Sequence, residues 1–324
     1  MSRSQVTFNR QPNAGDAATG KGTVFRRVVK DLRINRELYI IFMPVLVFYL
    51  IFHYAPMYGA VIAFKNYRPA IGIAASPWVG MAHFNAFFSS YYFWILLRNT
   101  LVLSFSSLLF GFPAPVLLAL LINELKSKRF ARTVQTITYM PHFISLVVVC
   151  GMIIQFTKSN GFITNILTKF GYPQQSLLSN PKAFVPIYVI SGIWQEVGWG
   201  SIIYLAALAG IDQELYEAAE IDGAGRFKKA VHITMPGIMP TIVVLFIMRV
   251  GRIMSMGGEK VILLYNPSIY DTADVISSYV YRRGIENTDW SFSSAVGLFN
   301  SVISFALVVS VNSLSKRVSQ MSLW

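Results

Sequence analysis

The chain has 324 residues, of which 54% are hydrophobic and only 13% are charged, and its mean hydropathy is +0.50. Typical soluble domains contain about 25% charged residues, so this composition excludes an ordinary water-facing globular protein. The single cysteine, Cys150, excludes a disulfide-stabilised scaffold. We therefore expect an integral membrane protein. The formal charge of +13 can reflect nucleic-acid binding, membrane topology or an anionic ligand, and the positions of the charges decide among these.

The first 37 residues are polar and basic, with eight Lys and Arg residues. A secretory signal peptide has a shorter basic region and an apolar run of about 7–15 residues, whereas the apolar run that follows here is longer. We therefore expect residues 1–37 to form a basic cytoplasmic segment that precedes a retained first span.

Six stretches of the remaining chain are candidates to cross a membrane. A spanning helix needs about 20 mostly apolar residues, and these stretches lack the two-residue alternation of β-strands. The sequence therefore predicts an all-α integral membrane protein with six transmembrane helices within residues 38–320. The expected spans are residues 38–62, 101–122, 134–156, 185–208, 241–256 with flanking residues, and 294–314.

The basic residues are unevenly distributed between the two sides of these spans. With both termini in the cytoplasm, 17 Lys and Arg residues fall in cytoplasmic segments and eight in outer segments. Cytoplasmic loops of membrane proteins carry an excess of Lys and Arg, so this orientation is the expected one. Most of the positive charge then reflects topology, and nothing in its placement indicates nucleic acid. Residues 64–97 and 257–291 become the two long outer loops.

The cytoplasmic stretch of residues 211–240, between the fourth and fifth spans, has the pattern of a helix, a turn and a second helix. Asp212 can cap the first helix, and Gly223 permits a sharp exit from it. A second short helix over residues 226–233 leads to Pro236, which suits the start of the next span. An ordinary solvated loop between two spans fits this pattern as well.

Within this stretch, however, the residues resemble the EAA loop of binding-protein-dependent ABC importer permeases. The family pattern is Glu-Ala-Ala, a Gly six positions after the Glu, and Ile-x-Leu-Pro further on, and here only the Leu is changed, to Met235. The resemblance implies that these residues contact a cytoplasmic ATPase. The residues assigned to this contact are Glu217, Ala218, Ala219, Asp222, Gly223, Ala224, Arg226, Phe227 and Pro236.

Four further stretches resemble the polysaccharide branch of carbohydrate importers, and alginate-type importers in particular. They are residues 194–200, 204–208, 264–267 and 293–299. The resemblance covers roughly residues 35–320. It implies a type I ABC importer permease fold with a cytoplasmic coupling helix, in a multi-pass protein of the bacterial inner membrane.

The resemblance also implies a set of partners. The chain would form a heterodimer with a second permease subunit, bind two cytoplasmic ABC ATPase subunits, and receive an oligosaccharide from an extracytoplasmic solute-binding protein. The chain lacks a Gly-x-x-x-x-Gly-Lys-Ser/Thr phosphate loop, so ATP and Mg²⁺ are expected on the ATPase. We expect no cofactor, no metal site and no catalytic residue in this chain, which is not expected to be an enzyme.

Glu196, Arg249 and Arg252 are expected at membrane depth, where a charge usually faces a partner or a cavity. In one interpretation Glu196 and Arg249 form a buried structural ion pair. In the other, the two arginines line the substrate path and bind the carboxylates of an acidic sugar. The two interpretations are compatible if Glu196 orients one arginine. The remaining residues assigned to this path are Trp194, Gln195 and Trp199.

The predicted substrate is therefore an acidic oligosaccharide of uronate or alginate type. Neutral oligosaccharides and glycerol phosphodiesters are the alternatives within the importer class. A membrane-embedded enzyme of polysaccharide metabolism would need acidic or histidine clusters at a membrane face, and the four histidines and Cys150 show no metal-ligand spacing. A channel is a further alternative, but it would not need a docking loop.

Overall fold

The computed structural model describes residues 30–255, 257–319 and 322. Regular secondary structure in these residues is helical, and the extended pairing among them is one isolated bridge between Lys65 and Trp78. The chain divides into two compact units, Met1–Gly59 and Ala60–Trp324. Most of the predicted basic segment 1–37 lies outside the described residues.

The first unit contains an apolar helical run with one π-helical turn. It consists of α2 (Arg36–Tyr49), the π-turn η1 (Leu50–Tyr54) and α3 (Ala55–Met57). Its side chains are largely apolar and exposed, Ile41 for example at 74%, as expected for a surface that lies in lipid. With η2 (Tyr58–Phe64) the run forms an apolar stretch long enough to cross a membrane, which agrees with the first predicted span.

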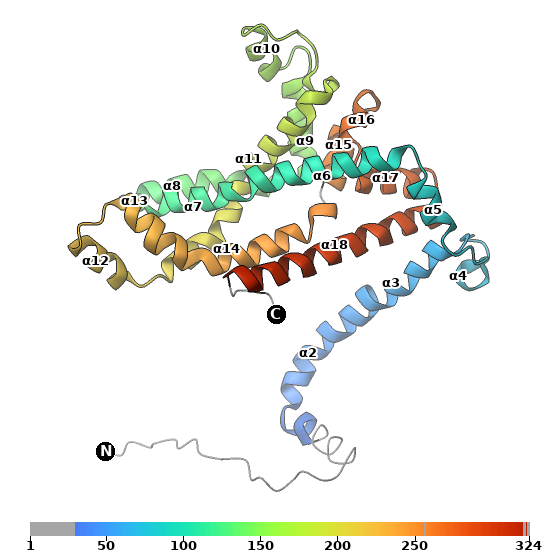
Figure 1. Ribbon diagram of the computed structural model, residues 1–324, viewed down its shortest axis with the longest axis horizontal. Helices are drawn as coiled ribbons and strands as arrows, with labels where there is room; N and C mark the ends of the chain where they lie inside the picture. Colours follow the sequence, from blue (N-terminus) through green and yellow to red (C-terminus); the bar gives the residue numbers. More distant parts are fainter. Residues whose placement is uncertain (1–29, 256, 320–321, 323–324) are drawn as a thin grey trace. The chain divides into compact units, whose positions relative to one another are not determined.

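The second unit is built around long helices. Figure 1 shows α6 and α18 running along its length, with α12 and α13 at one end and α5 and α17 at the other. The long helices are α6 (Tyr92–Gly111), α7 (Pro113–Asn123), α11 (Pro181–Ala209), α14 (Met235–Val250) and α18 (Trp290–Ser319).

Shorter elements connect these long helices. In the first half they are α4 (Gly72–Ala75), α5 (Ala82–Phe88), α8 (Lys128–Tyr139), η3 (Met140–Phe143), α9 (Leu146–Thr157), α10 (Phe162–Thr168) and η4 (Leu177–Ser179). In the second half they are α12 (Gln213–Ile221), α13 (Arg226–Lys229), η5 (Ala230–Thr234), η6 (Ile253–Ser255), α15 (Gly258–Leu264), η7 (Pro267–Ile269), α16 (Tyr270–Ala273), α17 (Ile276–Tyr281) and η8 (Arg282–Glu286).

Short polar side chains fix where several of these helices begin. Ser127 caps α8 by accepting a hydrogen bond from the backbone N–H of Phe130 at 3.3 Å. Asn180 caps α11 in the same way through Lys182, at 3.0 Å, and Pro181 occupies the first turn, where no N–H is needed. These caps satisfy backbone donors that the first helical turn leaves unpaired.

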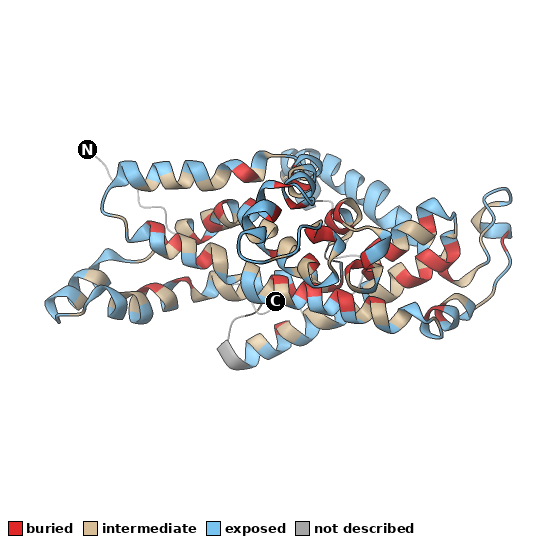
Figure 2. Ribbon diagram, turned by 90° about the horizontal axis from the view of Figure 1, so that it is seen from above, coloured by how far each residue is buried: buried red, intermediate tan, exposed pale blue. Residues whose placement is uncertain are grey.

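The core of the second unit consists of separate apolar clusters where the helices cross, and Figure 2 shows the buried residues concentrated there. One cluster joins α7, α11 and α14 through Ala119, Tyr204 and Ile238. Another joins α6, α9, α11 and the chain around α15 through residues such as Leu103 and Phe184. The helices that these clusters hold together form the walls of the cavity described below.

Among the residues that the structure describes, five helical stretches are long and apolar enough to cross a membrane. They are Arg36–Phe64, Tyr92–Asn123, Leu146–Thr168, Arg226–Val250 and Trp290–Arg317. Helix α11, which corresponds to the fourth predicted span, has 29 residues but is not among the five. Polar residues in its middle, including Gln195 and Glu196, lower its hydropathy.

Two predicted spans have the wrong boundaries. The third was expected as one helix over residues 134–156, but α8 ends at Tyr139 and Ile144 is extended before α9 begins. Pro141 lies in this break, and proline removes a backbone donor that a continuous helix would need. The fifth was expected over residues 241–256 with flanking residues, but its helical stretch runs from Arg226 to Val250. It therefore continues the predicted second helix of the loop rather than starting after it.

Candidate functional site

A cavity of about 640 Å³ lies between α6, α7, α11, α14 and the chain around α15. Five glycines line it, and their missing side chains leave the space open. A Cβ atom on Gly200 would lie 3.0 Å from the ring of Pro115, and one on Gly192 would lie 3.4 Å from Nζ of Lys260. The lining glycines are Gly111, Gly192, Gly200, Gly257 and Gly258.

Three basic and two acidic residues line this cavity, so its charged groups favour an anion. Arg249 lies in the last turn of α14, and Arg252 follows the end of that helix. Within the described part of the chain, neither guanidinium group forms a hydrogen bond or ion pair. The third basic residue is Lys260, and the acidic residues are Glu196 and Glu259. Arg249 and Arg252 are thus available to bind a carboxylate or phosphate from outside the chain.

Lys260 is a charged residue of the cavity that the sequence analysis placed in an outer loop. Its side chain is buried, its Nζ atom donates a hydrogen bond to the carbonyl oxygen of Tyr188 at 3.0 Å, and it lies 4.7 Å from the centre of that tyrosine ring. Burial lowers the pKa of Lys260, which lies outside the five apolar stretches, to about 8. The signal in the sequence for this was the Gly257–Gly258 pair. Gly257 has φ +87°, and the chain turns back among the helices at this point.

Glu196 pairs with His142, not with Arg249. Nδ1 of His142 lies 3.1 Å from Oε2 of Glu196, and more than half of the glutamate side chain is exposed. The ion pair between Glu196 and Arg249 expected in one interpretation is absent from the described residues, so that interpretation is wrong. Because Glu196 has a partner from the break after α8, both arginines remain free within the cavity.

The other predicted path residues lie in three different surroundings. Gln195 lines the cavity and is buried, and its amide donates to the carbonyl oxygen of Ile144 at 3.3 Å. Trp199 is stacked on His142, with ring centres 4.4 Å apart. Trp194 instead lines a separate apolar pocket with α9 and α10. The structure thus brings Gln195, Glu196 and the two arginines together, and neither Trp194 nor Trp199 lines the cavity.

Gly198 explains how α11 comes close enough to the break after α8 for these contacts. A Cβ atom on Gly198 would collide with the backbone carbonyl of Thr138. Only a glycine permits this approach of two backbones. The close packing holds Trp199 and Glu196 beside His142.

One buried polar side-chain atom of the cavity wall has no partner among the described residues. The hydroxyl oxygen of Ser107, on α6, is buried and forms no hydrogen bond with the described residues. Buried polar groups are nearly always paired, with protein or with water. A hydroxyl group of a bound sugar, or a water molecule, would complete this position.

The predicted coupling segment forms two helices joined by a tight turn. Oδ1 of Asp212 accepts a hydrogen bond from the backbone N–H of Glu214 at 3.0 Å, which confirms the predicted cap of α12. At the other end, the N–H of Ala224 donates to the carbonyl of Ala219 at 2.8 Å, while Gly223 has φ +72°. This is the Schellman arrangement, which favours glycine at the left-handed position.

The assigned residues of this segment are arranged around that turn. Glu217, Ala218 and Ala219 lie on α12, Asp222 caps its end, and Arg226 and Phe227 begin α13. Pro236 lies in the first turn of α14.

The same segment carries large apolar side chains that no neighbour covers. Ile221 is 87% exposed and Phe227 is 81% exposed. Exposed apolar groups next to exposed acids such as Glu217 are typical of a surface that binds another protein. The hydroxyl groups of Tyr216 and Thr234, 3.0 Å apart, link α12 to the base of α14.

Residues 97–320 match the family model described as binding-protein-dependent transport system inner membrane component. The chain belongs to this family. It is therefore a membrane-spanning ABC importer permease, a transport subunit rather than an enzyme.

The permease is similar to characterised proteins over almost its whole length. It is 42% identical to Protein LplB of Bacillus subtilis (strain 168), covering 98% of this chain and 99% of the relative. It is 40% identical to the polygalacturonan/rhamnogalacturonan transport system permease protein YteP of the same organism, covering 97% and 98%. Among solved structures, a chain of a bacterial alginate ABC transporter in complex with an alginate pentasaccharide-bound periplasmic protein is 43% identical, with a TM-score of 0.84, covering 92% of this chain and all of that one.

Proposed function

We propose that this permease moves acidic oligosaccharides, of uronate or alginate type, from a solute-binding protein into the cytoplasm. The observation that carries the proposal is the cavity, where Arg249, Arg252 and Lys260 outnumber Glu196 and Glu259. Guanidinium groups pair with carboxylates in a bidentate geometry. The names of YteP and of the alginate transporter describe polymers of acidic sugars, which supports the same substrate class. A neutral oligosaccharide would leave these three cations, of which Lys260 is buried, without a role.

We further propose that α11 is the sixth transmembrane helix and that both termini are cytoplasmic. Its 29 residues correspond to about 43 Å at 1.5 Å per residue, which exceeds the roughly 30 Å of a bilayer core. Its polar residues, Gln195 and Glu196, face a cavity rather than lipid, which is where polar groups are tolerated at membrane depth. In this topology residues 38–320 form the permease domain, with the coupling loop at about 211–240.

Helix α12 is the proposed coupling helix, which would bind one of two cytoplasmic ABC ATPase subunits. A second permease subunit would complete the substrate path, because several charged side chains of the cavity are exposed within this chain alone. ATP and Mg²⁺ would bind on the ATPase subunits. The exposed Ile221 and Phe227 support a docking role for this segment.

We propose that one helical stretch connects the ATPase contact with the cavity. The helical stretch Arg226–Val250 begins next to α12 and carries Arg249 near its far end. Its 25 residues span about 37 Å. Contacts between Tyr216 and Thr234, and between Glu220 and Lys229 at 3.4 Å, hold α12 to the base of this stretch. A rigid-body movement of α12 would therefore move Arg249 and change access to the cavity.

Transport by the complete complex in proteoliposomes tests the substrate class. We expect ATP-driven uptake of uronate oligosaccharides, reduced about tenfold or more by Arg249→Ala because a charge-assisted pair is lost. The matched control is Lys169→Ala, which removes an exposed positive charge outside the cavity. If the wild-type complex transports neutral oligosaccharides equally well, the acidic substrate class is wrong. Loss of complex assembly in Arg249→Ala would instead indicate a structural role for this arginine.

Copurification tests the importer assembly separately. Glu217→Arg, which reverses an exposed charge on α12, should reduce the amount of ATPase that purifies with the permease and should lower uptake. Glu37→Arg reverses a charge far from α12 in the sequence and is the control. Unchanged ATP-driven uptake in Glu217→Arg would show that this helix does not couple the two subunits.

A further inference from the structure

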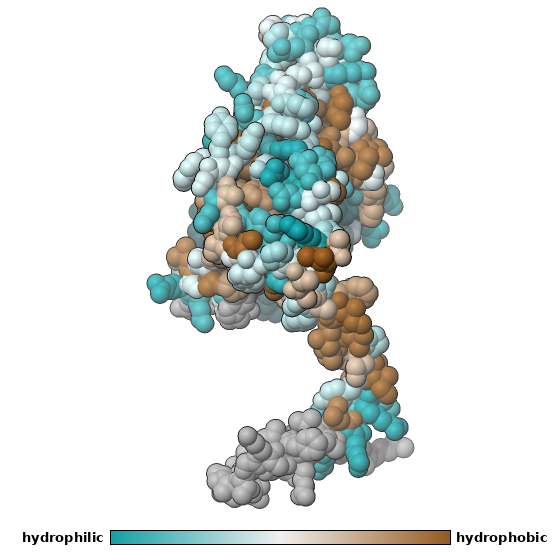
Figure 3. All heavy atoms as spheres, turned by 90° about the vertical axis from the view of Figure 1, so that its right-hand side faces the viewer, coloured by the Kyte–Doolittle hydropathy of each residue, from teal (hydrophilic) through white to brown (hydrophobic). Residues whose placement is uncertain are grey.

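A second polar pocket, separate from the cavity described above, lies near the opposite end of the unit from α12. It has a volume of about 250 Å³ and lies between the start of α6 and the segment from α16 to η8. At about 30 Å³ per water molecule this space holds roughly eight waters, which suits one sugar ring rather than a chain. We name it the tyrosine pocket; its main residues are Tyr92, Tyr270, Asp271, Asp274, Tyr279 and Arg282. Figure 3, which looks onto this end of the unit, shows hydrophilic residues near the centre of the face.

Aromatic rings form much of the wall. The rings of Tyr92 and Tyr279 have centres 5.9 Å apart and are tilted by 33°. The ring of Tyr270 lies against Arg282, whose guanidinium is 4.5 Å from the ring centre. Tyr92 is half exposed, so the pocket is open on its side. Tyrosine combines an apolar face with a hydroxyl group, and a sugar ring presents the matching C–H face and hydroxyl edge.

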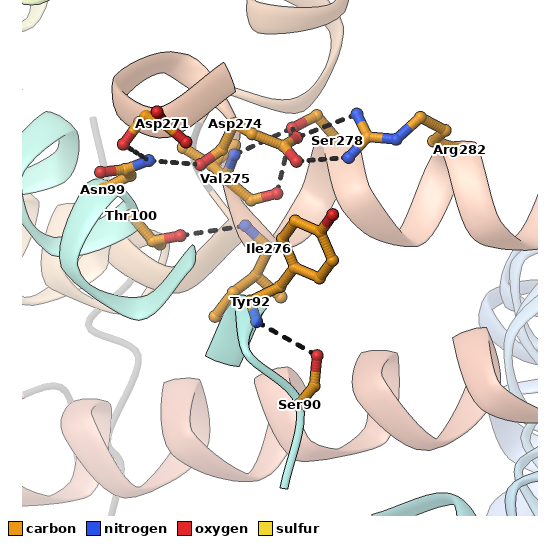
Figure 4. Close-up of polar contacts among 10 residues, drawn as sticks. All are labelled: Ser90, Tyr92, Asn99, Thr100, Asp271, Asp274, Val275, Ile276, Ser278 and Arg282. Carbon is orange, nitrogen blue, oxygen red and sulfur yellow. Dashed lines mark hydrogen bonds and ion pairs between the residues drawn. The ribbon is translucent and has the colours of Figure 1, made fainter. Parts of the chain in front are cut away.

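The polar groups of the pocket are held in place. Arg282 forms an ion pair with the buried carboxylate of Asp274, which also accepts a hydrogen bond from the hydroxyl of Ser278 at 2.7 Å (Figure 4). Although burial opposes its charge, the hydrogen bond and the charge of Asp274 raise the pKa of Arg282. Arg282 is therefore a permanently charged donor whose position is fixed before a ligand binds.

Side chains of α6 anchor the backbone behind these groups. The amide of Asn99 donates to the carbonyl oxygens of Asp271 and Asp274, both at 3.0 Å. The backbone N–H of Ile276 donates to the hydroxyl of Thr100, also at 3.0 Å. Figure 4 shows these bonds joining α6 to the link between α16 and α17. Such anchoring keeps the pocket from collapsing when it is empty, which reduces the ordering cost of binding.

Arg283, at the edge of the same pocket, has an unsatisfied donor. Its terminal nitrogen binds Asp289 at 2.9 Å, but its Nε atom is buried and has no partner among the described residues. An oxygen atom of a ligand could accept a hydrogen bond from this Nε atom. Two arginines and two aspartates, Asp271 and Asp274, line the pocket, so the formal charges of its lining residues balance.

We propose that the tyrosine pocket binds one sugar ring of an incoming oligosaccharide, by stacking on tyrosine and hydrogen bonding to the arginines and aspartates, without selecting for charge. The proposal rests on the proposed function in that the ligand is an oligosaccharide. The balanced charges distinguish this pocket from the basic cavity, which selects acidic sugars. The pocket thus adds affinity for sugars in general, and the cavity adds selectivity.

Saturation-transfer NMR on the complete complex in lipid nanodiscs tests this. The two probes are a uronate trisaccharide and the neutral trisaccharide maltotriose. Both should bind the wild-type complex, and Tyr92→Ala should weaken the binding of maltotriose about tenfold, because the aromatic face on which the sugar stacks is lost. The matched control is Tyr91→Ala, which removes a neighbouring ring that is 79% exposed and does not line the pocket. Ile95→Trp, which fills the pocket without removing a polar group, should have the same effect as Tyr92→Ala.

The outcomes separate this proposal from the proposed function. If Tyr92→Ala and Ile95→Trp both assemble with their partners and bind maltotriose like Tyr91→Ala, the pocket is not a sugar site, whatever the complex transports. Failure of maltotriose to bind the wild-type complex also overturns the pocket. If maltotriose binding depends on Tyr92 but uronate uptake fails, the proposed function is wrong and the pocket stands.

Discussion

Nδ1 of His142 lies 3.1 Å from Oε2 of Glu196, and this pair occupies the place where an ion pair between Glu196 and Arg249 was expected. The histidine ring also lies flat against Trp199, with ring planes only 3° apart. Glu196, which lines the cavity, therefore orients the stacked rings of His142 and Trp199, while the arginines are left for an incoming anion.

Glu196→Gln should preserve uptake and improve the apparent affinity for acidic substrates. Glutamine can still hydrogen-bond to His142, and the change removes one of the two negative charges that line the cavity. The expected decrease in KM for a uronate oligosaccharide is about twofold to fivefold, because exposed pairs contribute less than about 1 kcal/mol. Uptake kinetics in proteoliposomes measure this. A large loss of uptake would show that the carboxylate itself is required.

Lys260→Met should reduce the preference for acidic over neutral oligosaccharides. Methionine has a similar shape and no charge, so it fits the buried site without requiring hydrogen bonds. We expect the ratio of uronate to neutral uptake to fall about tenfold, the size of a lost charge-assisted contact. Competition between labelled uronate and unlabelled neutral oligosaccharide gives this ratio. An unchanged ratio would place Lys260 outside substrate recognition.

The stability of the purified complex should depend on pH through Lys260. Burial lowers its pKa to about 8 in the folded protein, against about 10.4 in an unfolded chain. Between these values the unfolded chain holds more protons, so the free energy of unfolding rises as pH increases from about 8 toward about 10. In detergent, the thermal midpoint of the wild type should therefore rise with pH over this range, relative to the midpoint of Lys260→Met measured at the same pH values. Parallel pH series would contradict this prediction.

Gly198→Ala should destabilise the permease, whereas Gly297→Ala should not. A Cβ atom at position 198 meets the carbonyl of Thr138, and the resulting shift of backbone costs about 1–3 kcal/mol. A Cβ atom at position 297, within α18, meets no atom within 4 Å, and alanine there stabilises the helix by about 0.5–1 kcal/mol. The thermal midpoints of the two variants should therefore move in opposite directions. Equal midpoints would mean that α8 and α11 separate without cost.

Gly223→Ala should weaken coupling to ATP hydrolysis more than Gly225→Ala does. Gly223 has φ +72°, where an L-residue costs about 1–2 kcal/mol. Gly225 has φ −68° and open space around it, so alanine fits there with little strain. The measurement is the ATPase rate of the complex with and without substrate-loaded binding protein. If both variants respond like the wild type, the shape of this turn does not control coupling.

The local structure around α12 could be predicted from the sequence because it depends on short-range chemistry. An aspartate cap and a glycine with positive φ act within a few residues of their own positions, and both occur as predicted. The charged residues on α11 and α14 were also predicted near one another, because hydropathy placed both at similar membrane depth. Gln195, Glu196, Arg249 and Arg252 do line one cavity.

The errors involve contacts between distant segments. The partner of Glu196 is His142, 54 positions earlier, in a break of the third span that an apolar run does not reveal. Lys260 was expected in a solvated outer loop, because hydropathy does not distinguish such a loop from a segment that turns back among the helices. Trp194 lies on the same helix as Glu196 but lines another pocket. The packing of α9 and α10 determines which side of α11 faces the cavity.

The glycines of the cavity wall set the width of the cavity, because each methyl group added at one of them would narrow it. At Gly192 the first added carbon would stand 3.4 Å from Nζ of Lys260, so any narrowing there also crowds the charge. At Gly111 the nearest groups are Ile193 and the guanidinium of Arg249, at 3.9 and 4.0 Å. The positions that limit the thickness of the substrate therefore lie beside the cations that select its charge. Changing the cations alone would not convert this protein into a permease for bulkier chains.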